Sequence, residues 1–178
     1  GQLSREEIET CSKDPVKVLC IRDGTVYGFS PKMRLDLVVN LMCKNAIENG
    51  RIFITGGGYQ RRPLLSLRTI AQFLSEVSKR EENFISEGNF DIVNLAEGNV
   101  QMNELAHRLS HFVKEYLGKN VETVVVPDDN DKRDYSVSID KLKSFYAFSP
   151  DYLEKEVLVE LIEGLQTLDF TDARYVTQ

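Results

Sequence analysis

The sequence lacks the features that mark several large classes of protein. Its 28 aspartates and glutamates outnumber 22 lysines and arginines, and this net charge of −6 argues against a general nucleic-acid binder, which presents a basic face. No apolar run approaches the roughly 20 residues that a membrane helix needs, and no secretory signal opens the chain. These absences predict a cytoplasmic protein that binds neither nucleic acid nor membrane.

Cysteine and histidine are also scarce, which limits the metal and thiol chemistry open to the chain. The odd number of cysteines, Cys11, Cys20 and Cys43, favours buried free thiols in a reducing compartment. His107 and His111 lie four residues apart on a predicted helix, beside its apolar stripe, and no third zinc ligand accompanies them. We therefore expect an exposed histidine pair, no metal site and no thiol nucleophile.

The chain does contain alternating apolar strands and amphipathic helices, which predicts an α/β fold. Its 178 residues amount to about one domain, and 42% of them are hydrophobic, as in ordinary globular proteins. Residues 16–21 and 90–95 have apolar side chains on both faces, typical of parallel strands buried between helical layers. Further strands are predicted over 51–55, 63–67, 121–126 and 135–139, and helices over 34–49, 68–82, 101–117, 140–147 and from 149 onward.

The two buried strands predict a partner. A parallel strand of this kind needs neighbours on both edges and helices on both faces, and the chain offers too few other strands to supply them. We infer that a strand-rich partner, covalent or separate, completes the sheet. Residues 22–28 leave the first strand as a loop, and ligands of open parallel sheets lie just beyond the carboxyl ends of the strands.

Three glycines, Gly56 to Gly58, precede two adjacent arginines, Arg61 and Arg62. Glycine permits positive φ and close approach of the backbone to a ligand, and arginine presents a planar fork to phosphate or carboxylate oxygens. The spacing fits neither a Walker A motif nor the G-x-G-x-x-G of a dinucleotide fold. An anion site and a tight hairpin with two solvated arginines both remain open.

Two other polar features also allow two interpretations. Residues 127–135 lack the glycine and the final glutamate of an EF-hand loop, so calcium is not expected, and they form either a charged surface loop or a ligand-binding loop. Asn40 interrupts the apolar surface of the helix over 34–49. Its amide either faces solvent or bonds to the backbone, or it contacts a ligand.

The order and spacing of these pieces resemble the C-terminal half of the extended short-chain dehydrogenases/reductases, the NAD-dependent nucleotide-sugar epimerase/dehydratase family. The resemblance rests on residues 21–28, 30–34, 36–40, 56–67, 93–95, 131–135 and 139–142. It implies a partial Rossmann-like, doubly wound sheet to which residues 1–28 and 90–100 contribute. It also implies a small α/β substrate-binding lobe over 29–89 and 101–178, with the N-terminal dinucleotide-binding half absent.

The resemblance further implies ligands and partners. Gly24, Thr25 and Val26 match a loop that passes between the nicotinamide of NAD or NADP and the sugar, so Thr25 and Val26 would contact both cofactor and substrate. Asn40 matches a residue near the nucleotide-sugar. Family members often pair through a helix bundle, so a homodimer is one of the expected assemblies.

The diphosphate of the nucleotide-sugar has its own matching residues. Arg62 matches an arginine that typically grips the diphosphate, and Arg133 matches a second contact to the diphosphate or ribose, with Tyr135 beside it. Two arginines far apart in the sequence are therefore expected to clamp one pyrophosphate.

The chain departs from the family pattern at two places. If residues 1–5 follow the catalytic tyrosine, the lysine of Tyr-x-x-x-Lys falls on Ser4 or Arg5, so no catalytic residue is predicted and the chain alone is expected to be inactive. Arg68 and Thr69 stand where the family commonly carries acidic residues. Two functions remain: the nucleotide-sugar-binding portion of an NAD(P)-dependent epimerase/dehydratase, or a non-catalytic binding or interaction module derived from that family.

Overall fold

The chain alternates strands and helices, as predicted for an α/β protein. The computed structural model describes residues 17–80, 82, 84–85, 90–126, 133–147 and 151–170. Its strands are β1 (Val18–Asp23), β2 (Thr25–Tyr27), β3 (Arg51–Ile54), β4 (Arg61–Ser66), β5 (Phe90–Leu95), β6 (Gly98–Gln101) and β7 (Glu122–Val125). Its helices are α2 (Val38–Asn49), α3 (Leu67–Lys79), α4 (Met102–Leu117), α5 (Asp140–Phe145) and α6 (Lys155–Gln166), with a 3-10 turn, η1 (Gly56–Gly58).

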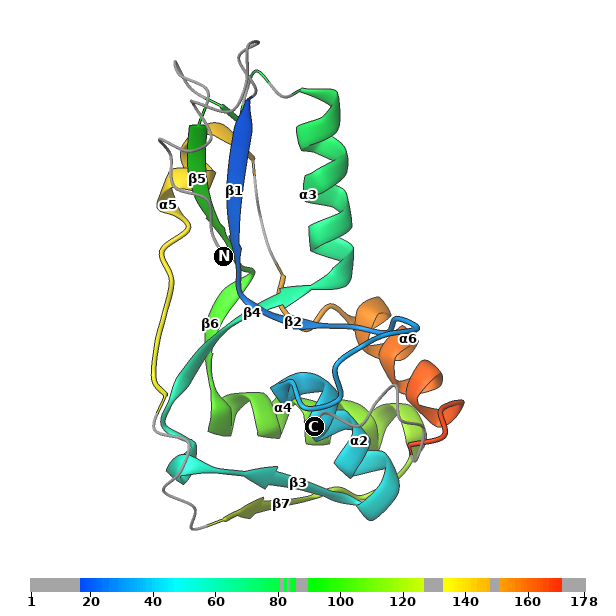
Figure 1. Ribbon diagram of the computed structural model, residues 1–178. Coiled ribbons are helices and arrows are strands. Elements are labelled where there is room, and N and C mark those ends of the chain that lie inside the picture. The colour runs from blue at the N-terminus through cyan, green and yellow to red at the C-terminus, as the bar shows by residue number, and fades with distance from the viewer. Residues whose placement is uncertain are drawn as a thin grey trace.

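The described strands form three small sheets. β1 and β5 pair in parallel, from Val18 opposite Phe90 to Asp23 opposite Leu95. In the middle sheet β4 pairs in parallel with β2 and antiparallel with β6, and in the third sheet β3 pairs in parallel with β7. In Figure 1, α3 stands beside β1 and β5, while α2, α4 and α6 lie below the middle sheet.

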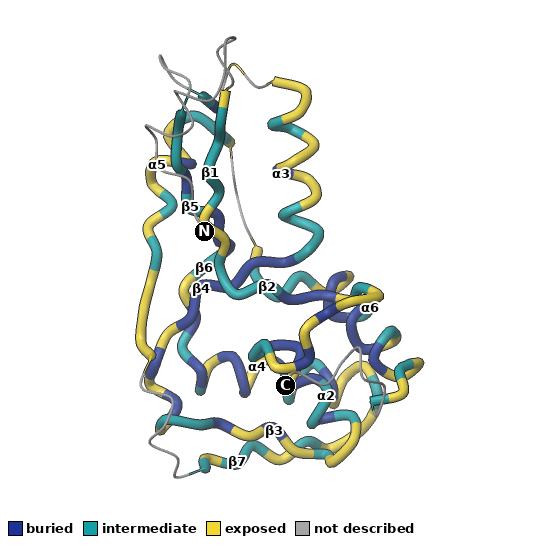
Figure 2. Tube along the Cα trace, viewed as in Figure 1, coloured by how far each residue is buried: buried dark blue, intermediate teal, exposed yellow. Residues whose placement is uncertain are grey.

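Two hydrophobic cores hold these layers together. The larger core lies between the middle sheet and helices α2, α4 and α6. The smaller core lies beside β5 and consists of Leu65, Phe73, Phe84, Val93, Leu95 and Leu142. Figure 2 shows the contrast, because β4 is mostly buried whereas β1 is nowhere dark blue.

Local sequence signals explain where the helices end. Gly50 and Gly118 take left-handed φ angles of 63° and 65° after α2 and α4, the conformation that glycine adopts at helix ends. Ser66 caps α3, its Oγ accepting a hydrogen bond from the amide of Thr69 at 3.1 Å. None of the helices in the described ranges is long and apolar enough to cross a bilayer.

Several predicted boundaries were wrong in the segment that follows β1. Residues 25–27, expected in a loop, form β2 because they pair with β4. The helix predicted from residue 34 begins at Val38, since Asp36 forms a two-point ion pair with Arg34 before the helix starts.

The interpretation of Gly56 to Gly58 as the turn of a hairpin was also wrong. All three glycines of η1 have positive φ, at 60°, 74° and 79°, as the glycine run indicated. The strands on either side, however, belong to different sheets and do not pair with each other. The turn therefore carries the chain from the third sheet to the middle one.

Residues 135–139, predicted as a strand, run extended but are not part of a sheet. Asparagine side chains replace the missing ladder: Asn99 accepts from the Val137 amide and donates to the Val137 carbonyl, both at 2.9 Å, and Asn94 donates to the Ser138 carbonyl at 2.9 Å. The interpretations placed on residues 1–5, on Cys11, on residues 127–132 and on the helix start at 149 and 150 lie outside the described residues.

Candidate functional site

A cleft lies where the chain leaves β1. Two cavities of about 460 Å³ and 270 Å³ adjoin there, sharing Thr25, Arg34, Leu37 and Tyr135 in their walls. Asp23, the last residue of β1, lines the larger cavity. The cleft thus lies beyond the carboxyl end of a parallel strand, where open α/β sheets bind ligands.

The structure brings the sequence-predicted site residues to this one cleft. The predicted residues divide between the two cavities. Gly24, Thr25, Val26, Asn40 and Tyr135 line the larger cavity, and Thr25, Arg62, Arg133 and Tyr135 line the smaller.

Asn40 has its carboxamide bonded to the backbone, one of the alternatives left open by the sequence. Its Oδ1 accepts from the Gly28 amide at 3.2 Å, and its Nδ2 donates to the Arg34 carbonyl at 2.9 Å. Asn40 is buried and lines the larger cavity. Its bonds hold both ends of the segment 28–34, which we call the cleft loop.

Arg62 is not the solvated arginine that one reading of the sequence expected. Only 6% of the residue is exposed. Its Nη1 donates to the carbonyl oxygens of Arg61 and Arg133, and its guanidinium carbon lies 5.3 Å from the centroid of the Tyr135 ring, a cation–π distance. Arg62 therefore ties the 133–135 segment to β4.

The 133–135 segment makes further contacts to β4, and two of its residues line the smaller cavity. The Arg61 amide donates to Asp134 Oδ1 at 2.8 Å, and the Tyr135 amide donates to the Arg61 carbonyl. Arg133 and Tyr135 are both exposed at the wall of the smaller cavity. Two arginines, far apart in the sequence, thus line the same 270 Å³ space.

Gln60 is a site residue that the sequence did not reveal. Among the described residues, its Oε1 is the one buried side-chain nitrogen or oxygen without a hydrogen-bond partner. The Nε2 donates to the Thr55 carbonyl at 2.6 Å, which fixes the orientation of the carboxamide. A buried acceptor without a hydrogen bond lowers the stability of the folded state by about 1–3 kcal/mol. Gln60 lines the smaller cavity two residues before Arg62. In an extended chain, residues two apart face the same side, so this spacing could have indicated that Gln60 accompanies Arg62.

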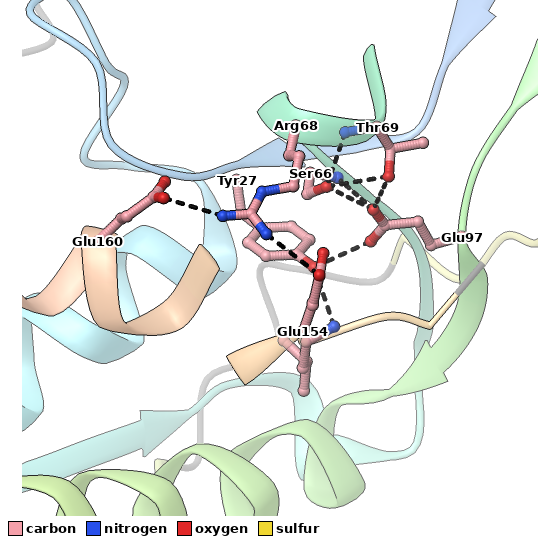
Figure 3. Close-up of polar contacts among 8 residues, drawn as sticks. Tyr27, Ser66, Arg68, Thr69, Glu97, Glu154 and Glu160 are labelled. Carbon is pink, nitrogen blue, oxygen red and sulfur yellow. Dashed lines mark hydrogen bonds and ion pairs between the residues drawn. The ribbon is translucent and has the colours of Figure 1, made fainter. Parts of the chain in front are cut away.

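Glu97 forms a buried polar network behind the cleft (Figure 3). Its Oε2 accepts from the Tyr27 hydroxyl at 2.9 Å. Its Oε1 accepts from the Ser66 amide at 3.1 Å, the Ser66 hydroxyl at 2.5 Å and the Thr69 hydroxyl at 2.6 Å. The Glu97 carboxylate, in the turn before β6, thus lies at the N-terminus of α3, where it complements the helix dipole.

The residues with metal or thiol chemistry lie away from the cleft. Cys43 is a buried free thiol, and burial raises its pKa to about 12, whereas Cys20 is a half-buried free thiol. His107 and His111 are exposed, as predicted, and His111 Nε2 lies 3.3 Å from Glu115. No cluster of potential metal ligands occurs in the part of the chain that the structure describes.

No protein-family model matches the chain, but solved structures do. UDP-glucuronic acid 4-epimerase from Bacillus cereus, in complex with UDP-glucuronic acid and NAD, superposes with a TM-score of 0.64 at 17% identity, over 89% of this chain and 47% of that one. An NAD-dependent NDP-hexosamine 5,6-dehydratase of tunicamycin biosynthesis gives 0.62 at 17% identity, over 92% and 50%. UDP-N-acetylglucosamine 4-epimerase from Methanobrevibacter ruminantium M1 gives 0.58 at 22% identity, over 84% and 46%.

The chain has the fold of the extended short-chain dehydrogenases/reductases. The resemblance carried by the order of its motifs is confirmed at this level, as is the partial Rossmann-like α/β architecture. The identity of 17–22% makes this a likeness of fold. The chain spans about half the length of these extended short-chain dehydrogenase/reductase structures.

Proposed function

We propose that this chain supplies the nucleotide-sugar-binding portion of an NAD- or NADP-dependent epimerase/dehydratase. One observation carries the proposal: within the fold of this family, the cleft beyond β1 gathers Arg62, Arg133 and Tyr135 around one cavity. A nucleoside diphosphate offers two phosphates for two guanidinium groups. Each charge-assisted contact would contribute about 1.5–3 kcal/mol.

The larger cavity would take the sugar. It adjoins the arginine-lined cavity through Thr25 and Tyr135, so a ligand whose diphosphate lies between the arginines extends its glycosyl group towards Val26 and Asn40. Gly24 allows the close approach that shapes this wall, because a Cβ there would lie 3.0 Å from the Pro63 carbonyl oxygen.

The remaining wall of the cleft would come from a dinucleotide-binding half. Gly24 to Val26 supply one side of a nicotinamide site, and the 178 residues contain no glycine-rich phosphate loop. Bound NAD would accept and return the hydride, while this chain binds and orients the sugar. Among the described strands β1 pairs with β5 alone, which leaves an edge for a parallel strand of that half.

Calorimetry with UDP-glucose and GDP-mannose tests the proposal. We expect one of them to bind, and Arg62→Ala and Arg133→Ala each to weaken binding by about tenfold or more, because each removes a charged contact. Arg51→Ala is the matched control, since Arg51 forms an exposed pair with Glu122 on the third sheet. Unchanged affinity in both cleft variants would refute the arginine clamp.

A non-catalytic module derived from this family is the second candidate, and Arg62 favours it. Its guanidinium donates to two backbone carbonyls, so Arg62 has a structural role of its own. Absence of binding to either nucleotide-sugar, with the chain folded, would support this candidate. Turnover of a nucleotide-sugar by the 178-residue chain would exclude it.

A further inference from the structure

Tyr27 connects the cleft to the buried network behind it. The residue lines the larger cavity from β2, yet its side chain is fully buried and its hydroxyl reaches the Glu97 carboxylate (Figure 3). The same hydroxyl accepts a hydrogen bond from the Leu153 amide at 2.9 Å. Burial, reinforced by the negative charge of Glu97, raises the pKa of Tyr27 above its ordinary value, so the hydroxyl remains a donor at neutral pH.

The residue held by this hydroxyl is strained. Leu153 has a φ of 63°, and it is the one non-glycine residue with positive φ in the described part of the chain. Residues other than glycine rarely adopt a positive φ, and this backbone conformation persists only where the surrounding structure imposes it. Leu153 stands two residues before α6, and the next residue, Glu154, pairs with Arg68 of α3 at 3.1 Å. The start of α6 is thus fastened to two elements behind the cleft.

α6 also touches the cleft loop further along its length. A Cβ placed on Gly164 would lie 2.1 Å from the Phe29 ring, so the ring packs directly on the helix backbone. Phe29 follows Gly28, whose amide donates to Asn40 of α2. The cleft loop is therefore held between α2 on one side and α6 on the other.

From these contacts we infer that Tyr27 latches α6 to the cleft and thereby sets the shape of the larger cavity. Tyr27 is a positioning residue: its hydroxyl holds Leu153, Leu153 fixes the start of α6, and α6 holds Phe29 against the loop. Loss of the hydroxyl would let the strained residue relax and α6 shift away from the loop. The effect on nucleotide-sugar affinity rests on the proposed function, whereas the effect on the loop does not.

Amide hydrogen exchange in Tyr27→Phe tests the latch, because this substitution keeps the buried ring and removes only the oxygen. We expect exchange at the Leu153 and Gly28 amides to become about tenfold faster. The matched control is Tyr116→Phe. The Tyr116 hydroxyl also reaches a glutamate of α6, Glu163 at 2.6 Å, but Tyr116 is exposed and lines neither cleft cavity. The control should leave both rates within about twofold.

A second variant keeps the inference testable if Tyr27→Phe fails to fold. Glu97→Gln retains an oxygen for Ser66 and Thr69 but presents an amide nitrogen or a weaker acceptor to Tyr27. It should accelerate exchange at Gly28 in the same direction. Unchanged exchange at Gly28 in a folded variant of either kind would overturn the latch.

Affinity measurements separate the latch from the proposed function. If the unmodified chain binds UDP-glucose or GDP-mannose, Tyr27→Phe should weaken that binding about tenfold and Tyr116→Phe should not. If the unmodified chain binds neither while exchange at Gly28 responds to Tyr27→Phe, the latch stands and the proposed function fails. Faster exchange at Gly28 combined with full nucleotide-sugar affinity would show that the latch does not shape the site.

Discussion

The two cores of this molecule differ in how completely they are enclosed. The larger core is surrounded by α2, α4, α6 and the middle sheet, and its helices bury a full apolar face. The smaller core lies beside a two-stranded sheet, with α3 and α5 packed against it, and no residue of β1 is buried. A parallel strand is normally buried on both faces, so the partly exposed β1 is consistent with the proposal that a dinucleotide-binding half completes this sheet.

This difference assigns separate roles to the two regions. The enclosed core supports the cleft, because β2, residues 28–37 and α2 carry most of its lining residues. The sheet of β1 and β5, which we call the open sheet, would contact the dinucleotide-binding half under the proposed function. We therefore expect the enclosed core to dominate the stability of this chain and the open sheet to contribute less.

The largest expected effect is a cavity in the enclosed core. Leu161→Ala removes a fully buried side chain of α6 and should lower the free energy of unfolding by about 2–5 kcal/mol. Leu74→Ala, on the half-exposed face of α3, is the matched control and should cost less than about 1 kcal/mol. Urea unfolding measures both. Equal losses of stability in the two variants would contradict the expectation that the enclosed core contributes most of the stability of the chain.

The next effect concerns the dynamics of the two regions. Amides of β1 should exchange on the order of 100-fold faster than those of α4. Among the described strands β1 pairs with β5 alone, and a strand paired on one side opens at a lower free energy than a packed helix. Native-state hydrogen exchange of the unmodified chain makes the measurement. Equal protection of β1 and α4 would show that the open sheet is as stable as the enclosed core.

The contrast between regions also explains how far the sequence could predict the structure. The predicted helices over 34–49 and 101–117 end where α2 and α4 end, because apolar spacing and a glycine after the last turn are local signals. β2 was missed because three residues become a strand only through pairing with β4, which lies 39 positions away by register. Residues 135–139 show the reverse, an alternating pattern whose expected strand partner is replaced by asparagine side chains.

The cleft was predictable to the extent that a family pattern could supply long-range information. The resemblance named residues 24–26, Asn40, Arg62, Arg133 and Tyr135, and all of them line the cleft. It could not show that Arg62 donates hydrogen bonds to two backbone carbonyls, or that the Asn40 amide bonds to the cleft loop. Gln60 and Glu97 were missed because an unpartnered acceptor and a buried carboxylate are defined only by the neighbours that the fold assembles.

A smaller effect is expected at the junction between the regions. Ser66 ends β4 and caps α3, and it also donates to Glu97, so Ser66→Ala should lower the free energy of unfolding by about 1–2 kcal/mol. Ser78→Ala is the control, because the Ser78 hydroxyl bonds only within the exposed side of α3, to the Ser75 carbonyl at 2.8 Å. Thermal or urea unfolding of the two variants distinguishes them. A loss no greater than that of the control would exclude Ser66 as a junction contact.

The smallest effect is a pH dependence at the end of the open strand. Partial desolvation of the carboxyl raises the pKa of Asp23 above its ordinary value of 3.8, although the residue is exposed, so the folded state holds this proton more tightly than the unfolded state does. The stabilisation is complete below pH 3.8 and is lost as the pH rises through the folded pKa, because ionisation then disfavours the folded form. Asp23→Asn cannot ionise, so its stability relative to the unmodified chain should increase as the pH rises through this interval. Urea unfolding of both proteins at matched pH values measures the difference. A constant difference would mean that the Asp23 carboxyl is as well solvated in the folded chain as in the unfolded chain.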